Sequence, residues 1–262
     1  MKSVSRRDSA FLAEMGIAPL WSLRQPPAGL VEEEAAPAVP VDATPAPAAP
    51  AALAAEPAVQ EPVAPEIGQM DWPALRAAIA GCTRCACRPG VKPVYGAGAG
   101  QAVWLVAAGA TSVADEQAGL PVAGDAGKLL DNMLAAAGHA RARDVYVTNL
   151  VKCRPVSASG GDRAPSADEV AACRPFLERE LALSGAGVLL TLGQVAANAM
   201  LGKPLQEALA GSRGQVHAVG GAAMVATLHP GELLRRGADK ALAWADLCRA
   251  MAVPPAGDDA AP

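Results

Sequence analysis

From about residue 70 onward, short continuous apolar runs alternate with stretches of helical periodicity. The runs predict buried strands over four ranges: 103–108, 145–151, 188–192 and 224–228. The periodic stretches predict helices over 128–137, from Ser166 to about residue 181, over 194–201 and over 240–251. Ser166, with Glu169 three residues later, has the pattern of a capping box. Strands that are apolar on both faces and separated by helices indicate an α/β fold in three layers, with a parallel sheet between helices.

Small and polar residues follow three of the predicted strands. Sheets of this class place their ligands at the carboxyl ends of the strands. We therefore expect the chemistry of the protein in residues 107–112, 149–155 and 229–234.

Proline divides the chain into segments. Residues 26–67 contain ten of the 23 prolines, mixed with Ala, Val and Glu, a composition that favours a disordered linker. We expect a short N-terminal element over 1–25 that can contact a protein partner, the linker over 26–67, a folded domain over 68–253 and a disordered tail over 254–262.

Composition and charge narrow the functional classes. Hydrophobic residues make up 52% of the chain, which is enough for a large core and excludes collagen-like and fully disordered proteins. No apolar run approaches the roughly 20 residues of a membrane span, and the N-terminus lacks the pattern of a signal peptide. We therefore expect a cytoplasmic protein, acting as a monomer without membrane contact. The net charge is −4, but residues 26–67 hold seven acids and no bases, so the folded part is mildly basic and compatible with DNA.

Six cysteines in a cytoplasmic chain indicate metal binding or inert thiols rather than disulfides. Cys82 and Cys85 form a C-x-x-C pair, Cys153 follows a predicted strand and Cys173 lies in the capped helix. Four thiolates suit either a structural zinc ion or an iron–sulfur cluster, and the residue types alone do not separate the two. Cys87 and Cys248 are interpreted as core or surface thiols.

Six segments in this order give the chain a resemblance to the family 4 uracil-DNA glycosylases: CTRC (82–85), GLPVAGDAGKLLDNML (119–134), VYVTNLVKCRP (145–155), ADEVAACRPFLERE (167–180), LLTLGQVAANAMLG (189–202) and LHPGELLR (228–235). The resemblance covers about residues 72–250. It implies a uracil-DNA glycosylase fold with a four-stranded parallel sheet, and a [4Fe-4S] cluster on Cys82, Cys85, Cys153 and Cys173. It also implies the activity, which is hydrolysis of the N-glycosidic bond of deoxyuridine flipped out of DNA during base excision repair.

The resemblance assigns roles to individual residues. Asn149 corresponds to the residue that reads uracil, donating to O4 and accepting from N3–H. His229 corresponds to the histidine that stabilises the departing base, and Leu233, Leu234 and Arg235 to the loop that inserts into DNA. The implied substrate-binding positions are Gly109, Ala110, Thr111, Val122, Asn149 and His229. Further cations are candidate phosphate contacts: Lys152, Arg154, Arg213, Arg235, Arg236 and Lys240.

The sequence departs from the family pattern in the loop after the first strand. The family loop reads Gly-Glu-Ala-Pro-Gly, whereas residues 108–112 read Ala-Gly-Ala-Thr-Ser, so the family carboxylate falls on Gly109. The aromatic residue that stacks on uracil falls on Val122. Three nearby acids are candidate substitutes: Asp115, Glu116 and Asp125.

Three hypotheses follow. The first is a uracil-DNA glycosylase without the usual catalytic Glu, and the second is a catalytically degenerate, cluster-stabilised DNA-binding relative. The third is a zinc-stabilised nucleotide-binding module, suggested by the Gly96-x-Gly98-x-Gly100 run. That run precedes its strand, whereas a dinucleotide-binding fingerprint follows one.

Overall fold

A single mixed sheet of six strands organises the described part of the chain. The structure is a computed structural model and describes residues 66–85 and 91–254. The strand order is β1-β3-β2-β4-β6-β5. The bounds are β1 Ala97–Gly98, β2 Trp104–Ala110, β3 Val145–Val151, β4 Val188–Leu192, β5 Val216–Val219 and β6 Ala222–Thr227. The four central strands are parallel, and the two edge strands β1 and β5 pair antiparallel.

The central strands form because their residues are apolar toward both faces. All seven residues of β3 and all five of β4 are buried. Such strands are stable only when helices cover both sides of the sheet. The register pairs Ala108 of β2 with Asn149 of β3 and with Leu192 of β4, which in turn pairs with Thr227 of β6. The carboxyl ends of all four strands therefore meet at one pole.

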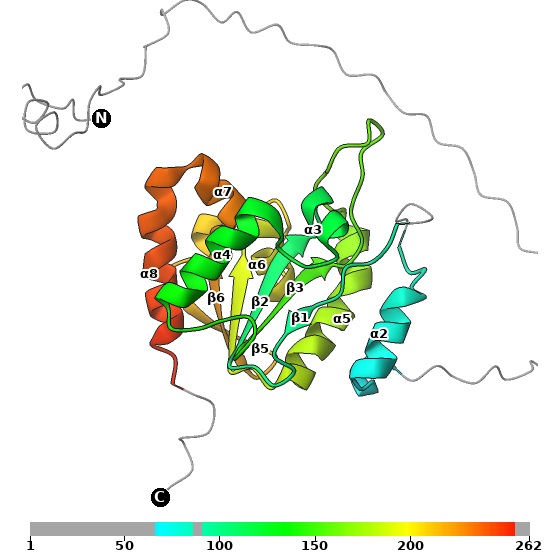
Figure 1. The fold of residues 1–262 in the computed structure, drawn as a ribbon, viewed down its shortest axis with the longest axis horizontal. Helices are drawn as coiled ribbons and strands as arrows, with labels where there is room; N and C mark the ends of the chain where they lie inside the picture. Colours follow the sequence, from blue (N-terminus) through cyan, green and yellow to red (C-terminus); the bar gives the residue numbers. More distant parts are fainter. Residues whose placement is uncertain (1–65, 86–90, 255–262) are drawn as a thin grey trace, which may run out of the picture. The chain divides into compact units, whose positions relative to one another are not determined.

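Helices cover the sheet on both faces (Figure 1). Their bounds are α2 Trp72–Ala80, α3 Val113–Ala118, α4 Gly124–Ala136, α5 Ala167–Ser184, α6 Gln194–Leu201, α7 Pro230–Arg235 and α8 Lys240–Met251, with 3-10 helices η1 Ile67–Gln69, η2 Leu209–Gly211 and η3 Gly237–Asp239. One core packs α5 and α6 on the sheet, and the other packs α4 and α8 on the opposite face. A third cluster joins η1 and α2 to α5 through Met70, Leu75, Ile79 and Phe176.

The predicted three-layer fold is confirmed, with differences at its margins. The four predicted strands are the four parallel strands, and the capping box of Ser166 and Glu169 opens α5. The edge strands β1 and β5 were not predicted, because they are too short or too exposed to give an apolar run. Residues 233–235, taken from the resemblance as a loop, lie in the short helix α7.

The predicted segments outside the domain are largely untested. The N-terminal element and most of the linker and tail lie outside the described residues, as does Cys87. Ile67, the last residue of the predicted linker, begins η1 and packs against the third cluster. Among the helices of residues 66–85 and 91–254, none combines the length and apolar content that crossing a bilayer requires.

Candidate functional site

Asn149 is the centre of a buried hydrogen-bond network at the carboxyl pole. Its side chain has no solvent-exposed surface. The amide nitrogen Nδ2 donates to Thr111 Oγ1 over 3.2 Å and to Asp115 Oδ2 over 3.1 Å. The amide oxygen Oδ1 is buried and has no hydrogen-bond partner. An unpaired buried acceptor costs roughly 1–3 kcal/mol, which makes this atom a candidate ligand-binding group.

Asp115 joins three segments of the pole through one buried carboxylate. It forms a capping box with Ser112 at the start of α3, accepting from the Ser112 backbone N–H. Its Oδ1 accepts from the backbone N–H of Ala123 over 2.7 Å, while Oδ2 accepts from Asn149. Asp115 is thus the one proposed substitute acid that touches Asn149, but its oxygens are occupied within the protein.

The other two candidate acids form ion pairs instead. Glu116 Oε2 lies 3.4 Å from Arg154 Nη1, and Asp125 pairs with Lys128 on the exposed side of α4. Neither forms a hydrogen bond or ion pair with Asn149 among the described residues.

Gly109 lies where a larger residue would be crowded. A Cβ added at Gly109 would lie 3.0 Å from Val195 Cβ at the start of α6. The next residues differ in their role. Ala110 ends β2 without a polar group, whereas Thr111 is buried and fixed to the end of β3, its hydroxyl lying 3.0 and 2.9 Å from the carbonyl oxygens of Val151 and Lys152.

Val122 has a strained backbone. Its φ of 49° lies in the left-handed region, where a β-branched side chain is rarely found. The residue is buried in the α4 side of the core, and its carbonyl accepts from Arg141 Nη2 over 3.0 Å. Strain of this kind persists only where neighbouring contacts impose it. At the position of the family's stacking aromatic, the chain therefore has an aliphatic side chain held in an unfavourable conformation.

His229 is placed directly after β6 and caps α7. Its Nδ1 accepts from the backbone N–H of Gly231 over 3.1 Å, so the neutral ring carries its proton on Nε2. Burial lowers the pKa of His229, and the carboxylates of Glu232 and Asp115 partly oppose that shift. The ring packs beside Gly193, whose φ of 84° and 3.3 Å clearance to His229 Cβ leave no room for a side chain. The carboxylate of Asp115, which binds Asn149, thus lies near enough to His229 to raise its pKa slightly against the effect of burial.

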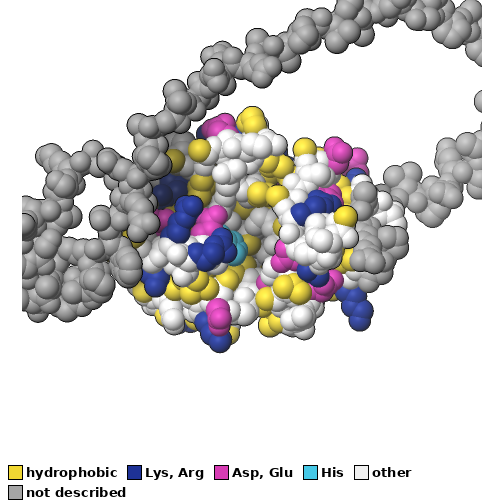
Figure 2. Space-filling view, turned by 90° about the horizontal axis from the view of Figure 1, so that it is seen from above, with side chains coloured by type: hydrophobic (Ala, Val, Ile, Leu, Met, Phe, Trp, Pro, Cys, Tyr) yellow, Lys and Arg dark blue, Asp and Glu magenta, His cyan; other side chains and the backbone are white. Residues whose placement is uncertain are grey.

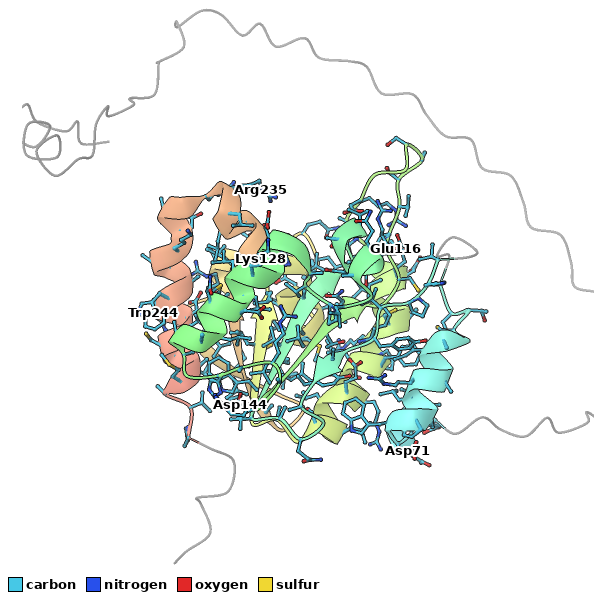
Figure 3. All side chains as sticks on the ribbon, in the orientation of Figure 1. Asp71, Glu116, Lys128, Asp144, Arg235 and Trp244 are labelled. Atoms are coloured by element: carbon cyan, nitrogen blue, oxygen red, sulfur yellow. The ribbon has the colours of Figure 1, made fainter. Side chains whose placement is uncertain are left out.

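The residues predicted to insert into DNA divide between core and surface. Leu233 is 1% exposed and belongs to the interior, whereas Leu234 is 50% exposed and Arg235 is also exposed. Arg235 and Lys128 lie at the same end of the molecule, opposite Asp144 (Figure 3). Viewed onto this end, the surface is hollowed, a histidine lies at the edge of the hollow, and Lys and Arg side chains lie on both sides of it, mixed with Asp and Glu (Figure 2). Only Leu234 and Arg235 of the predicted trio are thus available to DNA.

Several candidate phosphate contacts are engaged elsewhere. Lys152 is buried, and its Nζ donates to Glu180 Oε2, Thr148 Oγ1 and the Asn149 carbonyl, at 2.6, 2.7 and 2.8 Å. Arg213 pairs with buried Asp246. Arg154 pairs with Asp162 and Glu116. The prediction that Lys152 contacts phosphate is wrong, because its ammonium group is enclosed, while Arg235, Arg236 and Lys240 are exposed.

Three of the four predicted cysteine ligands, Cys82, Cys85 and Cys173, lie near enough to interact, and Cys153 follows Lys152, whose backbone contacts Cys173. Cys82 and Cys85 directly follow α2, and Cys82 packs on the cluster that includes Phe176 of α5. Burial raises the pKa of the Cys173 thiol, and negative charge on Cys85 and Cys82 raises it further. The backbone N–H of Lys152, the residue before Cys153, favours the thiolate of Cys173. These couplings bring the C-x-x-C pair, the end of β3 and α5 to one region.

Four thiolates suit either a zinc ion or an iron–sulfur cluster. Within residues 66–85 and 91–254, no three Cys, His, Asp or Glu side chains are close enough to hold one metal ion. A tetrahedral zinc ion would need four sulfurs at bonds of about 2.3 Å. In an iron–sulfur cluster the thiolates bind different irons, so their sulfurs lie farther apart. Cys248 is exposed on α8, away from this set.

Three features of the site were not predicted from the sequence. They are the Thr111–Asn149–Asp115 network, the packing of Val195 against Gly109 and the buried Lys152–Glu180 pair. Ser112 and Asp115 have the spacing of a capping box, so the sequence itself indicates this part of the network. The other two depend on tertiary contacts, which no local pattern reports.

The comparisons with known proteins all point to the same family. Residues 96–248 match the family model described as the uracil DNA glycosylase superfamily. The chain is 32% identical over 133 residues to the type-4 uracil-DNA glycosylase of Pyrobaculum aerophilum, covering 50% of this chain and 65% of that protein. It is 35% identical over 123 residues to that of Thermotoga maritima, covering 46% and 60%.

A third relative shows a shorter and closer match. The type-4 uracil-DNA glycosylase of Archaeoglobus fulgidus is 44% identical over 79 residues, which is 30% of this chain and 37% of that protein. The chain thus matches less than two thirds of the length of each of these curated relatives. The resemblance derived from the sequence motifs is confirmed.

Proposed function

This chain belongs to the uracil DNA glycosylase superfamily, and we propose that it is a uracil-DNA glycosylase of base excision repair with a slow hydrolytic step. The observation that carries the proposal is the link that Asp115 makes at the strand ends. Its carboxylate binds Asn149 directly, and its charge acts on His229. Asn149 and His229, the two polar residues that a uracil pocket requires, would therefore both lie near the carboxylate of Asp115.

His229 would supply electrostatic stabilisation to the departing base. Its Nδ1 is occupied by the Gly231 N–H, so its Nε2–H is the donor. The glycosidic bond breaks with negative charge developing on uracil, and a neutral N–H donor placed at O2 stabilises that charge. The lowered pKa keeps the ring neutral near pH 7, which fixes Nε2 in the donor state.

Asn149 would bind the base through Oδ1, the unpaired acceptor, which matches the N3–H of uracil. Because Asn149 is enclosed, a base reaches it only after neighbouring residues move. Asp115, which binds Asn149, also accepts from the backbone N–H of Ala123, the residue that follows Val122. Its strained backbone makes the 119–123 segment the candidate for that movement.

The proposed site has no carboxylate in position to activate the attacking water. Gly109 brings no carboxylate, and Asp115 is engaged by three donors. Absence of a general base typically slows such a reaction about 10²–10⁴-fold. The proposal is therefore an enzyme that relies on positioning and on charge stabilisation by His229.

The cysteine set would hold a [4Fe-4S] cluster on Cys82, Cys85, Cys153 and Cys173. Such a cluster would supply a structural cross-link among the end of α2, the end of β3 and α5. Iron and acid-labile sulfide should be present in protein purified without oxygen. Replacement of Cys153 or Cys173 by Ala should remove both, whereas Cys248→Ala should not. Unchanged iron content in the first two variants would refute the ligand assignment.

Uracil-containing DNA is the proposed partner, approached by Leu234 and Arg235 from the hollowed pole. A monomer acting in the cytoplasm, with a protein partner for residues 1–25, completes the proposal. Direct evidence would be release of free uracil from single- and double-stranded oligonucleotides under single-turnover conditions. His229→Ala should slow release about 10²–10³-fold, while His217→Ala, a histidine of β5, should leave it unchanged. Equal rates in both variants would remove His229 from the mechanism.

A second candidate function is favoured by the packing at Gly109 and the enclosure of Asn149. A Cβ at 109 would lie only 3.0 Å from Val195 Cβ, so a larger residue there is crowded, and Asn149 offers no exposed surface. Both features suit a DNA-binding relative that has lost catalysis and keeps the cluster for folding. No uracil release, together with DNA binding that weakens steeply with salt, would favour this candidate.

A further inference from the structure

The backbone of Val122 is held by contacts on both sides of its Cα atom. Its φ of 49° makes it the one non-glycine residue with a positive φ in the ranges 66–85 and 91–254. A β-branched residue adopts this conformation only where its surroundings over-determine it. The bonds of the flanking peptide groups therefore identify what imposes the strain.

Arg141 binds the two carbonyl groups that flank this Cα atom. Its Nη1 donates to the Pro121 oxygen over 2.9 Å, and its Nη2 donates to the Val122 oxygen over 3.0 Å. In an extended chain, successive carbonyl groups point to opposite sides. One guanidinium group could then reach only one of them, so binding both excludes an extended Val122.

Two residues of α4 complete this arrangement. A Cβ at Gly127 would lie 2.4 Å from the Val122 carbonyl oxygen, so only glycine leaves room for that oxygen. Asp131, one turn further along the helix, accepts from Arg141 Nε over 2.6 Å and fixes the guanidinium plane. Lysine could not replace Arg141, because its ammonium group is a single donor centre without the planar fork.

The peptide group between Val122 and Ala123 also contacts the buried network. Its oxygen accepts from Arg141, and its N–H donates to Asp115 Oδ1 over 2.7 Å. The other oxygen of Asp115 accepts from Asn149. Because a peptide group is planar and rigid, rotating it would weaken both of its bonds at once. One rigid group thus connects Arg141 to the carboxylate that holds Asn149.

We infer that Arg141 is a positioning residue of this site: it holds Val122 in the left-handed conformation and so keeps the 122–123 peptide group on Asp115. The relevance of this role to catalysis rests on the proposed function. Without Arg141, Val122 relaxes to a negative φ, the N–H of the peptide group leaves Asp115, and the bonds that orient Asn149 loosen. Arg141 acts through this peptide group rather than on the base.

The first test compares alanine and glycine at position 122 in the full chain. Glycine tolerates a positive φ better than alanine, whereas alanine is favoured at a negative φ. With Arg141 present, Val122→Gly should therefore melt about 2–4 °C above Val122→Ala, the shift expected for a domain of this size. With Arg141→Met the order should reverse, so that the alanine variant melts higher. An unchanged order would overturn the inference.

Two further variants control this comparison. Arg141→Lys keeps the charge but not the fork, so it should behave as Arg141→Met does, and it replaces that variant if methionine prevents folding. Arg143→Met removes a neighbouring arginine that binds Asp144 and the Gly138 carbonyl, and the glycine variant should remain the more stable one there. A reversal in the Arg143→Met background would also overturn the inference.

The second test measures the reaction under single-turnover conditions, with saturating protein and well below every melting midpoint. Arg141→Met and Arg141→Lys should release uracil about tenfold or more slowly, because a binding group is displaced. Arg143→Met should release it at the wild-type rate. Wild-type rates in both Arg141 variants would overturn the positioning role. If the wild-type protein releases no uracil, the proposed function fails, while the melting comparison still decides whether Arg141 holds Val122.

Discussion

Gly109 and Val195 together determine what chemistry the pole can support. Gly109 follows Ala108, which pairs with Asn149 across the sheet, so position 109 lies beside the base-reading residue. Val195 Cβ lies 3.0 Å from the point that a Cβ at 109 would occupy. A side chain at this position therefore crowds Val195, and a smaller residue at 195 would relieve the contact.

Restoring the carboxylate should need both changes. Gly109→Glu alone should destabilise the protein with little gain in activity, because a Cβ 3.0 Å from Val195 Cβ is tighter than most real contacts and forces Val195 to shift. Gly109→Glu with Val195→Ala should accelerate uracil release by up to about 10²-fold, within the range of general-base catalysis. Single-turnover assays measure the effect. The control is Gly109→Gln with Val195→Ala, and equal rates for the Glu and Gln variants would show that no general base has been created.

His229 should make stability depend on pH. Burial lowers its pKa in the folded state below the unfolded value of about 6.5. The unfolded chain therefore binds the proton more readily, so the free energy of unfolding should fall as pH decreases through and below 6.5. Urea denaturation at pH 7.5 and pH 5 should show a smaller difference for His229→Ala than for the wild-type protein. An identical pH difference in both proteins would contradict this assignment.

At the scale of elements, the Lys152–Glu180 pair ties β3 to α5. The ammonium group donates to three acceptors, one of which is the Asn149 carbonyl. Tyr146 adds a hydroxyl 3.5 Å from Glu180, and burial together with the Glu180 charge raises the pKa of that phenol. Because Cys153 follows Lys152 and Cys173 precedes Glu180 by two helical turns, the same two elements carry proposed cluster ligands.

Removing one partner of this pair should lower the free energy of unfolding, whereas removing both should change it little. Lys152→Met leaves Glu180 buried without its cation and should lower the free energy of unfolding by about 3–5 kcal/mol. The double variant Lys152→Met with Glu180→Met should recover most of that loss. Urea denaturation of the three proteins measures both effects. A double variant no more stable than the single one would show that the ion pair itself stabilises the fold.

The sequence predicts elements well where each is determined by its own residues. The β3 run VYVTNLV and the Ser166–Glu169 box identify a strand and a helix start without reference to the rest of the chain. Strand β5 alternates between exposed and half-buried residues and gives no comparable signal. Lys152 illustrates the limit for the site, because its charge predicted exposure while its partner lies 28 residues away on α5.

At the scale of the molecule, the two ends of the sheet differ in their exposed groups. The carboxyl end carries Arg235, Arg236 and Lys240, together with exposed Leu234. The opposite end carries the His139–Asp144 pair, beside which lies Arg143. Only the first end is associated with the buried network around Asn149, so DNA is expected there.

Salt dependence should distinguish the two ends. Arg235→Ala should weaken DNA binding and reduce the slope of log K against log salt by about 0.9, the value for one phosphate contact on duplex DNA. Arg143→Ala, a surface arginine at the opposite end, should leave both quantities unchanged. Fluorescence anisotropy over 50–200 mM salt gives the slopes. The reverse pattern would place the DNA-binding surface at the other end of the sheet.

The attachment of η1 and α2 has a mechanical consequence. The described chain enters the domain at Glu66; η1 and α2 are held to α5 by Met70, Leu75, Ile79 and Phe176, and α2 also stacks Trp72 on Tyr146 of β3. Tension applied to the preceding residues would reach this small contact first, then the cysteine pair after α2, and only later the sheet. A pull on the N-terminus would thus detach one helix long before it disturbed the pole around Asn149.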